Sequence, residues 1–366
     1  MKKAIFLANT DNFHKNFHLP YLYRLIEKGY EVHIVSSGDV TFDYRIKKHS
    51  IVFGRTPLKK ENVEAFRELR ELFSDYYDLI YFSTPIVGAI GRLALIGKKH
   101  GRVVYSAHGY SFFEGNSKLS NLKYIFIEKL LSRLTDCSFT MNAEDYNAYF
   151  KYKFKSKEIY NVDGVGVDTS VFKCVSKEDK AALRNEYGYD KEEFILIFPA
   201  ELTERKNQIE LFYIIRELKN RGIFVRLLLA GNGIKREEYI QTIRDMDICD
   251  YIELLGYRKD VKNLLALSDC LVASSLNEGL PINVIEGLSS GLPVIASKVR
   301  GHVDLIEDGY NGFVFELGDH KTAADKIEQL IKDKELRSSM SRNAKLSSER
   351  YDINNVIEQY DKIWGI

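Results

Sequence analysis

The sequence has no long apolar run, and this absence limits the kinds of protein it can be. No stretch of the 366 residues approaches the roughly 18 consecutive apolar residues that a membrane-spanning helix needs. Residues 4–8 are apolar, but the run ends at Asn9, short of the ~7–15-residue core of a signal peptide. We therefore expect a buried first strand at the start of the chain.

Cysteine and proline are also scarce. The four cysteines lie far apart and form no CxxC pair, which argues against a disulfide scaffold or a zinc site and fits a reducing compartment. There are only 6 prolines and no Gly/Ser tract, so a long flexible linker is not expected.

Charge is nearly balanced over the whole chain but unevenly divided along it. The net charge is +1, yet residues 1–160 hold 25 Lys and Arg against 17 Asp and Glu, and the remainder holds 28 against 35. A basic N-terminal part suits an anionic partner, which could be nucleic acid, an anionic membrane surface or a phosphorylated substrate. An uneven solvated surface would give the same counts, so charge alone leaves these alternatives open.

Short β-branched runs alternate with amphipathic stretches, first over residues 1–160 and again from residue 194 onward. Continuous apolar strands separated by helices predict parallel sheets covered on both faces. Ligands in such sheets bind at the carboxyl ends of the strands. We therefore predict an α/β protein of two doubly wound, Rossmann-like sheets that face each other across a cleft. Strands are expected at 4–8, 31–36, 50–53, 79–83, 103–107, 137–141, 194–199, 226–230, 251–255, 270–274 and 293–297, and helices at 19–28, 62–73, 87–100, 122–134, 208–221, 234–246, 261–267 and 282–290.

The segment 274–287 leaves a predicted strand and opens a predicted helix. Pro281 suits the first helical position, and the free N–H groups of the helix start, with Gly279, form a potential anion site. Glu278 stands in the loop and Glu286 lies little more than one turn into the helix, so two carboxylates flank a phosphate-binding turn. A sugar nucleotide needs this combination of amides for the diphosphate and carboxylates for ribose and sugar hydroxyls. The strand–glycine–proline–helix context carries the interpretation, because the glutamate spacing alone would not.

A second strand-to-helix turn, residues 199–208, contains Arg205 and Lys206 side by side. Arginine offers planar, forked donors and lysine a point charge, a combination that suits a diphosphate. Taken alone, this pair is equally compatible with a solvated basic turn. Together with the 274–287 segment it indicates phosphate binding.

These segments resemble the retaining family-4 glycosyltransferases, which have the GT-B fold. The resemblance includes Glu278 to Glu286, the Arg205–Lys206 pair and the turn around His108. It extends to the family's domain-linking segment at 164–168, its base-contacting turn at 255–258 and its signature at 290–297. It covers essentially the whole chain and implies an acceptor-binding domain at 1–165, a nucleotide-sugar domain at 166–345 and a C-terminal helix at 346–366 that packs back toward the first domain.

The resemblance also implies roles for individual residues. Arg205 and Lys206 would neutralise the donor diphosphate and the charge that builds on the leaving group. Glu286 would hold the ribose, Glu278 the hydroxyls of the transferred sugar, and His108 would lie near the reacting face of that sugar. The implied donor-binding residues are Arg205, Lys206, Gly256, Tyr257, Glu278, Gly279, Leu280, Pro281, Ile282 and Glu286, and the implied catalytic residues are His108, Arg205, Lys206 and Glu278.

The same resemblance implies front-face attack, in which the donor phosphate helps to take the acceptor proton and no side chain acts as nucleophile. We expect no cofactor and no metal ion, since Arg205 and Lys206 would supply the charge of a divalent cation. The single Asp-x-Asp sequence, Asp245 to Asp247, falls at the end of a predicted helix and is interpreted as a solvated turn.

The loop after the first strand departs from the family pattern. Residues 9–18 contain no glycine, where many relatives have a Gly-Gly pair that approaches the donor phosphate. The loop resembles a subgroup that builds bacterial capsule, exopolysaccharide and O-antigen. We expect Asn16, His18 and His108 to contact the acceptor; the alternative is a loop with His14 and His18 on its solvent side.

This subgroup implies a nucleotide-diphosphate donor, most commonly UDP-linked hexose or N-acetylhexosamine, and a polyprenyl-diphosphate-linked saccharide acceptor. It also implies a peripheral place on the cytoplasmic face of the plasma membrane. The basic N-terminal part would then favour an anionic membrane by about 1 kcal/mol per nearby Lys or Arg. Residues 118–126 could lie at that interface or form an ordinary core-facing helix. The alternating lysines at 151, 153, 155 and 157 predict an extended edge or a solvated loop.

Three other functions remain open at this point. A sugar-nucleotide epimerase on the same fold would need acid/base carboxylates in both domains, and the first domain offers Asp11 and Glu114 but no clear pair. A non-catalytic sugar-nucleotide sensor would be favoured by loss of Arg205, Lys206 or Glu286, and all three are present. Nucleic-acid binding is disfavoured because no segment resembles a known binding module.

Overall fold

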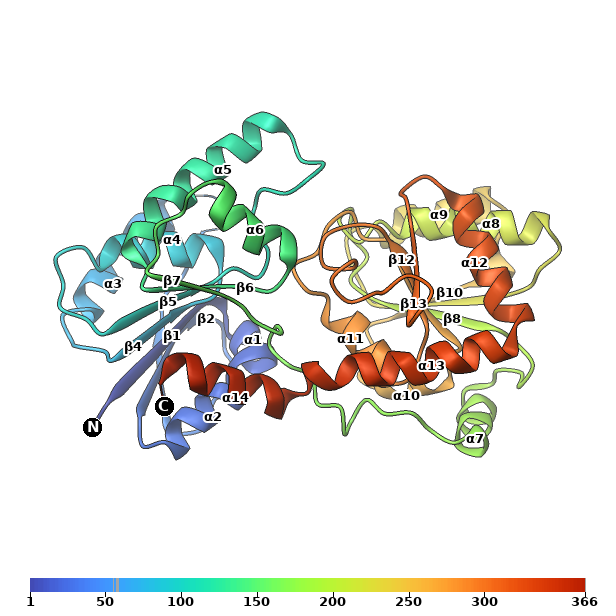
Figure 1. The fold of residues 1–366 in the computed structure, drawn as a ribbon, viewed down its shortest axis with the longest axis horizontal. Coiled ribbons are helices and arrows are strands. Elements are labelled where there is room, and N and C mark those ends of the chain that lie inside the picture. The colour runs from blue at the N-terminus through green and yellow to red at the C-terminus, as the bar shows by residue number, and fades with distance from the viewer. Residues whose placement is uncertain (55, 57–58, 366) are drawn as a thin grey trace. The chain divides into compact units, whose positions relative to one another are not determined.

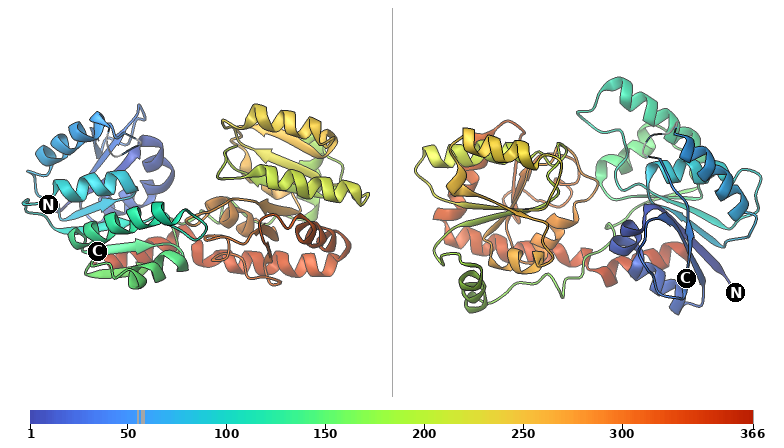
Figure 2. Two further views of the ribbon diagram at one scale, coloured as in Figure 1. Left: turned by 90° about the horizontal axis from the view of Figure 1, so that it is seen from above. Right: turned by 180° about the vertical axis from the view of Figure 1, so that it is seen from behind.

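The chain folds into two compact units, each built on one parallel β-sheet. The computed structural model describes residues 1–54, 56 and 59–365. The N-terminal unit comprises residues 1–165 together with the segment from residue 354 onward, and the C-terminal unit comprises residues 166–353. Helices cover both faces of each sheet (Figures 1 and 2). The predicted fold class, two parallel-sheet Rossmann-like domains, is confirmed.

The N-terminal unit has a seven-stranded sheet in the order β3-β2-β1-β4-β5-β6-β7. Its core strands are almost entirely apolar and fully buried, as in Ala4–Ala8 of β1. Its strands are β1 (Lys3–Thr10), β2 (Glu31–Ser37), β3 (Ile46–Ser50), β4 (Leu79–Phe82), β5 (Arg102–Ser106), β6 (Cys137–Thr140) and β7 (Glu158–Asn161). Its helical segments are α1 (Asp11–Phe13), the π-helical turn η1 (His14–His18), α2 (Leu19–Glu27), α3 (Lys60–Leu72), α4 (Pro85–Ala94), α5 (Lys118–Leu131), η2 (Ser132–Leu134), α6 (Ala143–Lys151) and the last helix, α14 (Ile353–Trp364).

The C-terminal unit has a six-stranded sheet in the order β10-β9-β8-β11-β12-β13. Its strands are β8 (Ile195–Pro199), β9 (Arg226–Ala230), β10 (Ile252–Gly256), β11 (Cys270–Ala273), β12 (Val294–Ser297) and β13 (Gly312–Phe315). Its helical segments are α7 (Lys177–Tyr187), α8 (Gln208–Asn220), α9 (Arg236–Asp245), η3 (Cys249–Tyr251), α10 (Val261–Leu267), α11 (Ile282–Ser289), α12 (His320–Lys332), α13 (Lys334–Ser348) and η4 (Glu349–Tyr351).

Each sheet reverses its strand order at one place. The N-terminal sheet does so between β1 and β4, and the C-terminal sheet between β8 and β11. In open α/β sheets the loops at the carboxyl ends of such strands diverge to opposite faces and leave a crevice for a ligand. The topology therefore marks the loops after β1 and β4, and those after β8 and β11, as candidate ligand-binding positions.

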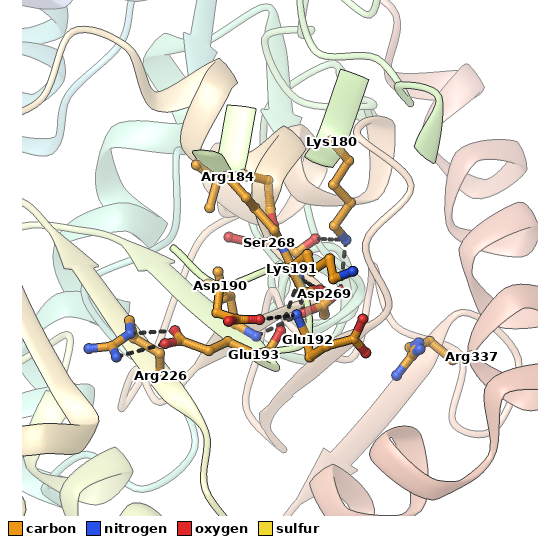
Figure 3. Close-up of polar contacts among 12 residues, drawn as sticks. Lys180, Arg184, Asp190, Lys191, Glu192, Glu193, Arg226, Ser268, Asp269 and Arg337 are labelled. Carbon is orange, nitrogen blue, oxygen red and sulfur yellow. Dashed lines mark hydrogen bonds and ion pairs between the residues drawn. The ribbon is translucent and has the colours of Figure 1, made fainter. Parts of the chain in front are cut away.

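The amino edges of both sheets are held by aspartates that stand just before a strand. Asp269, before β11, accepts the N–H of Ile195 at 2.8 Å and ion-pairs with Lys180 and Arg184 at 2.7 and 2.6 Å (Figure 3). Asp78 and Asp136 accept backbone N–H groups of neighbouring strands at 2.8 Å in the N-terminal sheet. These contacts fix strand register at the edge opposite the candidate sites.

Several predicted elements need correction. The third strand runs over Ile46–Ser50 rather than 50–53, since Ile51 and Phe53 are buried as a loop against the core. The edge strands β7 and β13 were missed; β7 is half exposed and lacks the continuous apolar run of the buried strands. The helix expected at 87–100 begins at Pro85 and ends at Ala94.

Three further differences concern segments that were expected to be irregular or to end elsewhere. Residues 11–18 form helical turns continuous with α2 instead of a loop. The alternating lysines form no strand in the described chain, because Lys151 ends α6 and Lys153 turns the backbone with φ 56°. The boundary expected at residue 345 lies at 353, since α13 continues to Ser348.

Candidate active site

Two cations and one carboxylate converge at the point where the C-terminal sheet reverses its order. Arg205 and Lys206 follow β8, and Glu278 follows the adjacent strand β11. Glu278 accepts from Arg205 Nη1 at 2.7 Å through one carboxylate oxygen and from Lys206 Nζ at 2.6 Å through the other. The structure thus brings together three residues that sequence reasoning placed in one site.

Backbone contacts hold the loops after β8 and β11 against each other. The N–H of Leu276 donates to the carbonyl of Arg205 at 2.8 Å, and the Ser274 hydroxyl donates to the carbonyl of Lys206 at 3.1 Å. Asn207, next in the chain, takes the left-handed conformation with φ 51° and starts α8. The positions of the two cations are therefore fixed by the main chain as well as by Glu278.

Burial sets the charge states of this group. Burial alone would raise the pKa of Glu278, but Lys206 and Arg205 outweigh it and hold that pKa at about 2. Burial lowers the pKa of Lys206 below its usual range, against the opposing attraction of Glu278. Half of the Arg205 side chain stays exposed, so its guanidinium is open to an incoming anion.

The helix after this loop supplies backbone donors. Pro281 is the residue before the first turn of α11, one position earlier than predicted. The N–H groups of Ile282 and Asn283 belong to that first turn, where no preceding helical carbonyl can accept them. The Asn283 side chain donates to the carbonyl of Pro199 at 3.0 Å, which turns this face of α11 toward the end of β8. Gly279 and Leu280 lie in the half-exposed approach to the helix.

Glu286 lies three residues after Asn283 and hence on the same face of α11. Its carboxylate has no hydrogen-bonding or ionic partner among the described residues, and burial raises its pKa to about 7. Glu286 is partly buried, so its carboxylate loses part of its hydration without gaining a protein partner, and hydroxyl donors from a ligand would relieve that cost. The environment of Glu286 is therefore compatible with the ribose-binding role expected for it.

Sequence reasoning missed a segment that clamps Glu278 from the other side. Arg300, after β12, donates from Nε to the Glu278 carbonyl at 2.9 Å and accepts the Glu278 N–H at 3.2 Å. A Cβ on Gly301 would stand 2.8 Å from the Glu278 Cβ, so only glycine fits there. The neighbouring His302 is buried, and burial lowers its pKa to about 4. One sequence feature could have revealed this segment: Arg300–His302 closely follow β12, which lies beside β11 in the sheet.

The loop after β9 was also missed, and it packs against the turn after β8. A Cβ on Gly231 would come within 2.1 Å of the Ala200 carbonyl oxygen, and one on Gly233 equally close to that of Leu202. Gly256, at the end of β10, has φ 67° and bridges to Gly231, while Tyr257 after it is 72% exposed. Gly256 and Tyr257 thus lie at the same carboxyl edge of the sheet as Arg205, two strands away.

In the N-terminal unit, the two histidines of the first loop are buried, so the alternative that placed them on the solvent side is wrong. His14 Nε2 contacts the Val35 carbonyl at 3.1 Å, the two Nδ1 atoms of His14 and His18 lie 2.9 Å apart, and His18 Nε2 contacts the Ser83 hydroxyl at 2.9 Å. Because the Val35 carbonyl can only accept, His14 Nε2 must donate to it. The other two donors follow for neutral rings: His18 Nδ1 donates to His14 Nδ1, and the Ser83 hydroxyl donates to His18 Nε2. Both imidazoles are neutral in this arrangement.

This chain of hydrogen bonds changes the interpretation of His18. Both of its ring nitrogens are used inside the protein and its side chain is buried, so it offers no atom to an acceptor in this conformation. Burial lowers its pKa well below the usual range. Its position fixes η1, on which Asn16 is exposed to solvent. We therefore retain Asn16 as an acceptor-contact candidate and treat His18 as a residue that positions η1.

His108 follows β5, and its ring lies edge-on to Phe13 of the first loop at 5.3 Å. Its Nε2 atom is buried and has no partner among the described residues. Burial lowers the pKa of His108 to about 4, so the imidazole is neutral at physiological pH. It is therefore suited to a hydrogen bond with a sugar hydroxyl and not to proton donation as an imidazolium.

Two further observations concern metals and membranes. Within the described residues, no group of three or more His, Cys, Asp or Glu side chains is arranged to hold a metal ion. Asp245 ends α9, and Asp247 pairs with Lys219. Over the same part of the chain, no helix has the length and apolar character to cross a bilayer.

Comparison with known proteins identifies the family. Residues 179–347 match the model of the glycosyl transferases group 1, and residues 3–140 match a glycosyl transferase 4-like model. The chain is 34% identical to the putative glycosyltransferase EpsD of Bacillus subtilis over all of its own length and 96% of that protein. It is 26% identical to an Escherichia coli UDP-Gal:alpha-D-GlcNAc-diphosphoundecaprenol alpha-1,3-galactosyltransferase, covering 84% of this chain and 81% of the relative.

The fold comparison agrees with the sequence comparison. Anabaena HepE, solved in complex with UDP, superimposes with a TM-score of 0.80 over the full length of both chains at 21% identity. The sequence similarity covers both sheets, and the matched group 1 region contains the whole Arg205–Glu278–Glu286 group. The chain is thus a member of the group 1 glycosyltransferases with the GT-B fold.

Proposed function

We propose that this glycosyltransferase moves a hexosyl or N-acetylhexosaminyl group from a UDP-linked donor to a polyprenyl-diphosphate-linked saccharide, with retention of anomeric configuration. The convergence of Arg205, Lys206 and Glu278 at the β8–β11 switch point carries the proposal. The galactosyltransferase activity of the Escherichia coli relative, named above, supports the donor and acceptor classes, and the UDP complex of HepE supports the base.

The donor site has one group for each part of a sugar nucleotide. Arg205 and Lys206 take the diphosphate and stabilise the charge that develops as it leaves, with the first-turn amides of α11. Glu286 accepts from the ribose hydroxyls, and Glu278 accepts from the transferred sugar. Gly256 and Tyr257 contact the base, and Gly279 to Ile282 line the phosphates.

The N-terminal unit supplies the acceptor side. His108, neutral at working pH, hydrogen-bonds the transferred sugar, and Asn16 on η1 contacts the acceptor. Attack from the face of the departing diphosphate lets a phosphate oxygen take the acceptor proton, so no side-chain nucleophile is required. No cofactor is required, and the two cations act in place of a divalent metal, so we expect full activity in EDTA. The enzyme acts at the cytoplasmic face of the plasma membrane, where its lipid-linked acceptor lies.

A thermal-shift panel of UDP, GDP, ADP and their sugars tests the donor site. A nucleotide at 100 times its Kd should stabilise the fold by about 2.7 kcal/mol. We expect UDP to shift the melt of the wild type and of Glu358→Ala, an exposed control in α14, and Glu286→Ala to abolish the shift. Absence of any nucleotide shift would contradict the proposal, and it would count equally against a sugar-nucleotide epimerase or sensor. Product anomer analysis by NMR and Mn²⁺ or Mg²⁺ dependence after EDTA treatment test retention and metal independence separately.

A further inference from the structure

The outer face of α5 carries an apolar stripe that is exposed to solvent. Leu119, Leu122, Phe126 and Leu130 are 80%, 66%, 62% and 47% exposed. Their spacing places them on one side of the helix. On the opposite side, Leu131 is buried, and the half-buried Tyr124 and Ile125 pack on the core of the N-terminal unit. Figure 1 shows α5 on the outside of that unit.

The charges on this helix are those expected of a surface that meets anions. Lys118, Lys123 and Lys129 flank the apolar stripe on its two sides. The one acidic residue of α5, Glu128, is turned inward, where it pairs with Arg92 at 3.2 Å. The outer face of α5 thus combines large apolar side chains with positive charge and carries no negative charge, a pattern typical of helices that lie in a membrane interface.

A basic hollow lies at the carboxyl end of the same helix. This cavity, of about 470 Å³, is lined by Arg133, which follows α5, and by Lys98, His100, Lys155 and Lys157. Its one carboxylate, Asp136, is already engaged by Lys157 at 2.6 Å and by the N–H of Val103. Arg133 and Lys155 are exposed and have no ionic partner among the described residues. At the other end of α5, by contrast, Glu114 and Glu144 line a separate hollow.

We propose that α5 docks this protein onto an anionic phospholipid bilayer. The stripe Leu119, Leu122, Phe126 and Leu130 enters the boundary between headgroups and acyl chains, and Arg133 and Lys155 in the basic hollow bind lipid phosphate. The choice of a membrane as the partner rests on the proposed function, whereas the surface that meets it comes from the exposed residues of α5. A second copy of the chain on the same stripe is disfavoured, because an isologous contact would bring the flanking lysines together.

Vesicle flotation of the full chain, without donor or acceptor, tests the docking surface. One set of vesicles is phosphatidylcholine alone, and the other is phosphatidylcholine mixed with anionic phosphatidylglycerol. We expect binding to the anionic vesicles only. Leu122→Glu and Phe126→Glu should reduce the partition coefficient by at least about tenfold, and Leu119→Glu, at the most exposed position, should act in the same direction. Leu346→Glu, on α13 and 57% exposed, is the matched control and should bind like the wild type.

The basic hollow is tested separately. Arg133→Glu and Lys155→Glu should each weaken binding to anionic vesicles by about fivefold or more, whereas Lys345→Glu on α13 should not. Unchanged binding of the stripe variants, or equal binding to both kinds of vesicle, would overturn the proposal. A wild-type dimer that becomes monomeric in Leu122→Glu, without vesicle binding, would assign the stripe to a second copy. Because UDP melting shifts are measured on the same proteins without lipid, failure of docking and failure of the donor site are distinguishable.

Discussion

The Glu278 carboxylate lies 2.6 Å from Lys206 Nζ and 2.7 Å from Arg205 Nη1, so one buried acid holds both cations proposed to bind the donor diphosphate. A diphosphate that binds here competes with Glu278 for these cations. Once the two cations release the carboxylate oxygens of Glu278, these oxygens can accept hydrogen bonds from the transferred sugar. The ion pair thereby couples diphosphate binding to sugar binding.

Glu278→Gln tests this coupling. A neutral amide competes less for Arg205 and Lys206, so we expect the Kd for UDP to stay the same or fall. Transfer should slow by about 100-fold, because the sugar loses a charged acceptor in the transition state. Titration calorimetry with UDP and initial rates with the intact donor measure the two quantities. Glu204→Gln, an exposed change on the turn after β8, serves as control. A parallel loss of UDP affinity and rate would contradict the coupling.

Glu286 should make stability fall as pH rises. Its pKa in the folded protein is raised to about 7 from 4.5, so the folded state binds the proton more tightly than the unfolded state. Its contribution is therefore present below pH 4.5 and is lost between about pH 4.5 and 7. We expect Glu286→Gln to gain stability relative to the wild type as pH rises from 5 to 8. Urea unfolding at the two pH values measures this, with Glu358→Gln as control. A difference that is constant with pH would contradict the shifted pKa.

The sequence predicted most strands and the turns after β8 and β11, because both leave local patterns. A buried strand followed by Glu278, Gly279 and Pro281 is readable from neighbouring residues alone. Arg300 and Gly301 were missed, since their contact with Glu278 depends on β12 lying beside β11 in the sheet. The burial of His18 was missed for the same reason: its partner Ser83 is 65 residues away.

The histidine chain should make the N-terminal unit acid-sensitive. Burial lowers the pKa of His14 from its usual 6.5 to about 4, and it also lowers the pKa of His18 well below its usual value. A lowered histidine pKa contributes stability that is present above pH 6.5 and lost as pH falls from about 6.5 toward 4. We expect His14→Gln to lose less free energy of unfolding than the wild type as pH falls from about 6.5 toward 4. The fluorescence of Trp364, the single tryptophan, reports on the region, because its ring contacts Phe6 and Tyr81, which in turn contact His18. An unchanged pH dependence of stability in His14→Gln would contradict a role for the hydrogen bonds that link Ser83, His18 and His14.

Asp269 should contribute more to stability than the exposed ion pairs of the C-terminal unit. Asp269→Ala leaves Lys180 and the buried Arg184 without their carboxylate and removes the acceptor for the Ile195 N–H (Figure 3). Removing one partner of a buried pair destabilises by about 3–5 kcal/mol, and we expect the lower end because Lys180 keeps some solvent contact. Asp325→Ala, which breaks the solvent-exposed pair with Arg221, should cost little. Urea unfolding followed by circular dichroism compares the two variants. Equal midpoints would mean that the amino edge of the sheet is held by the packing of β8 and β11 alone.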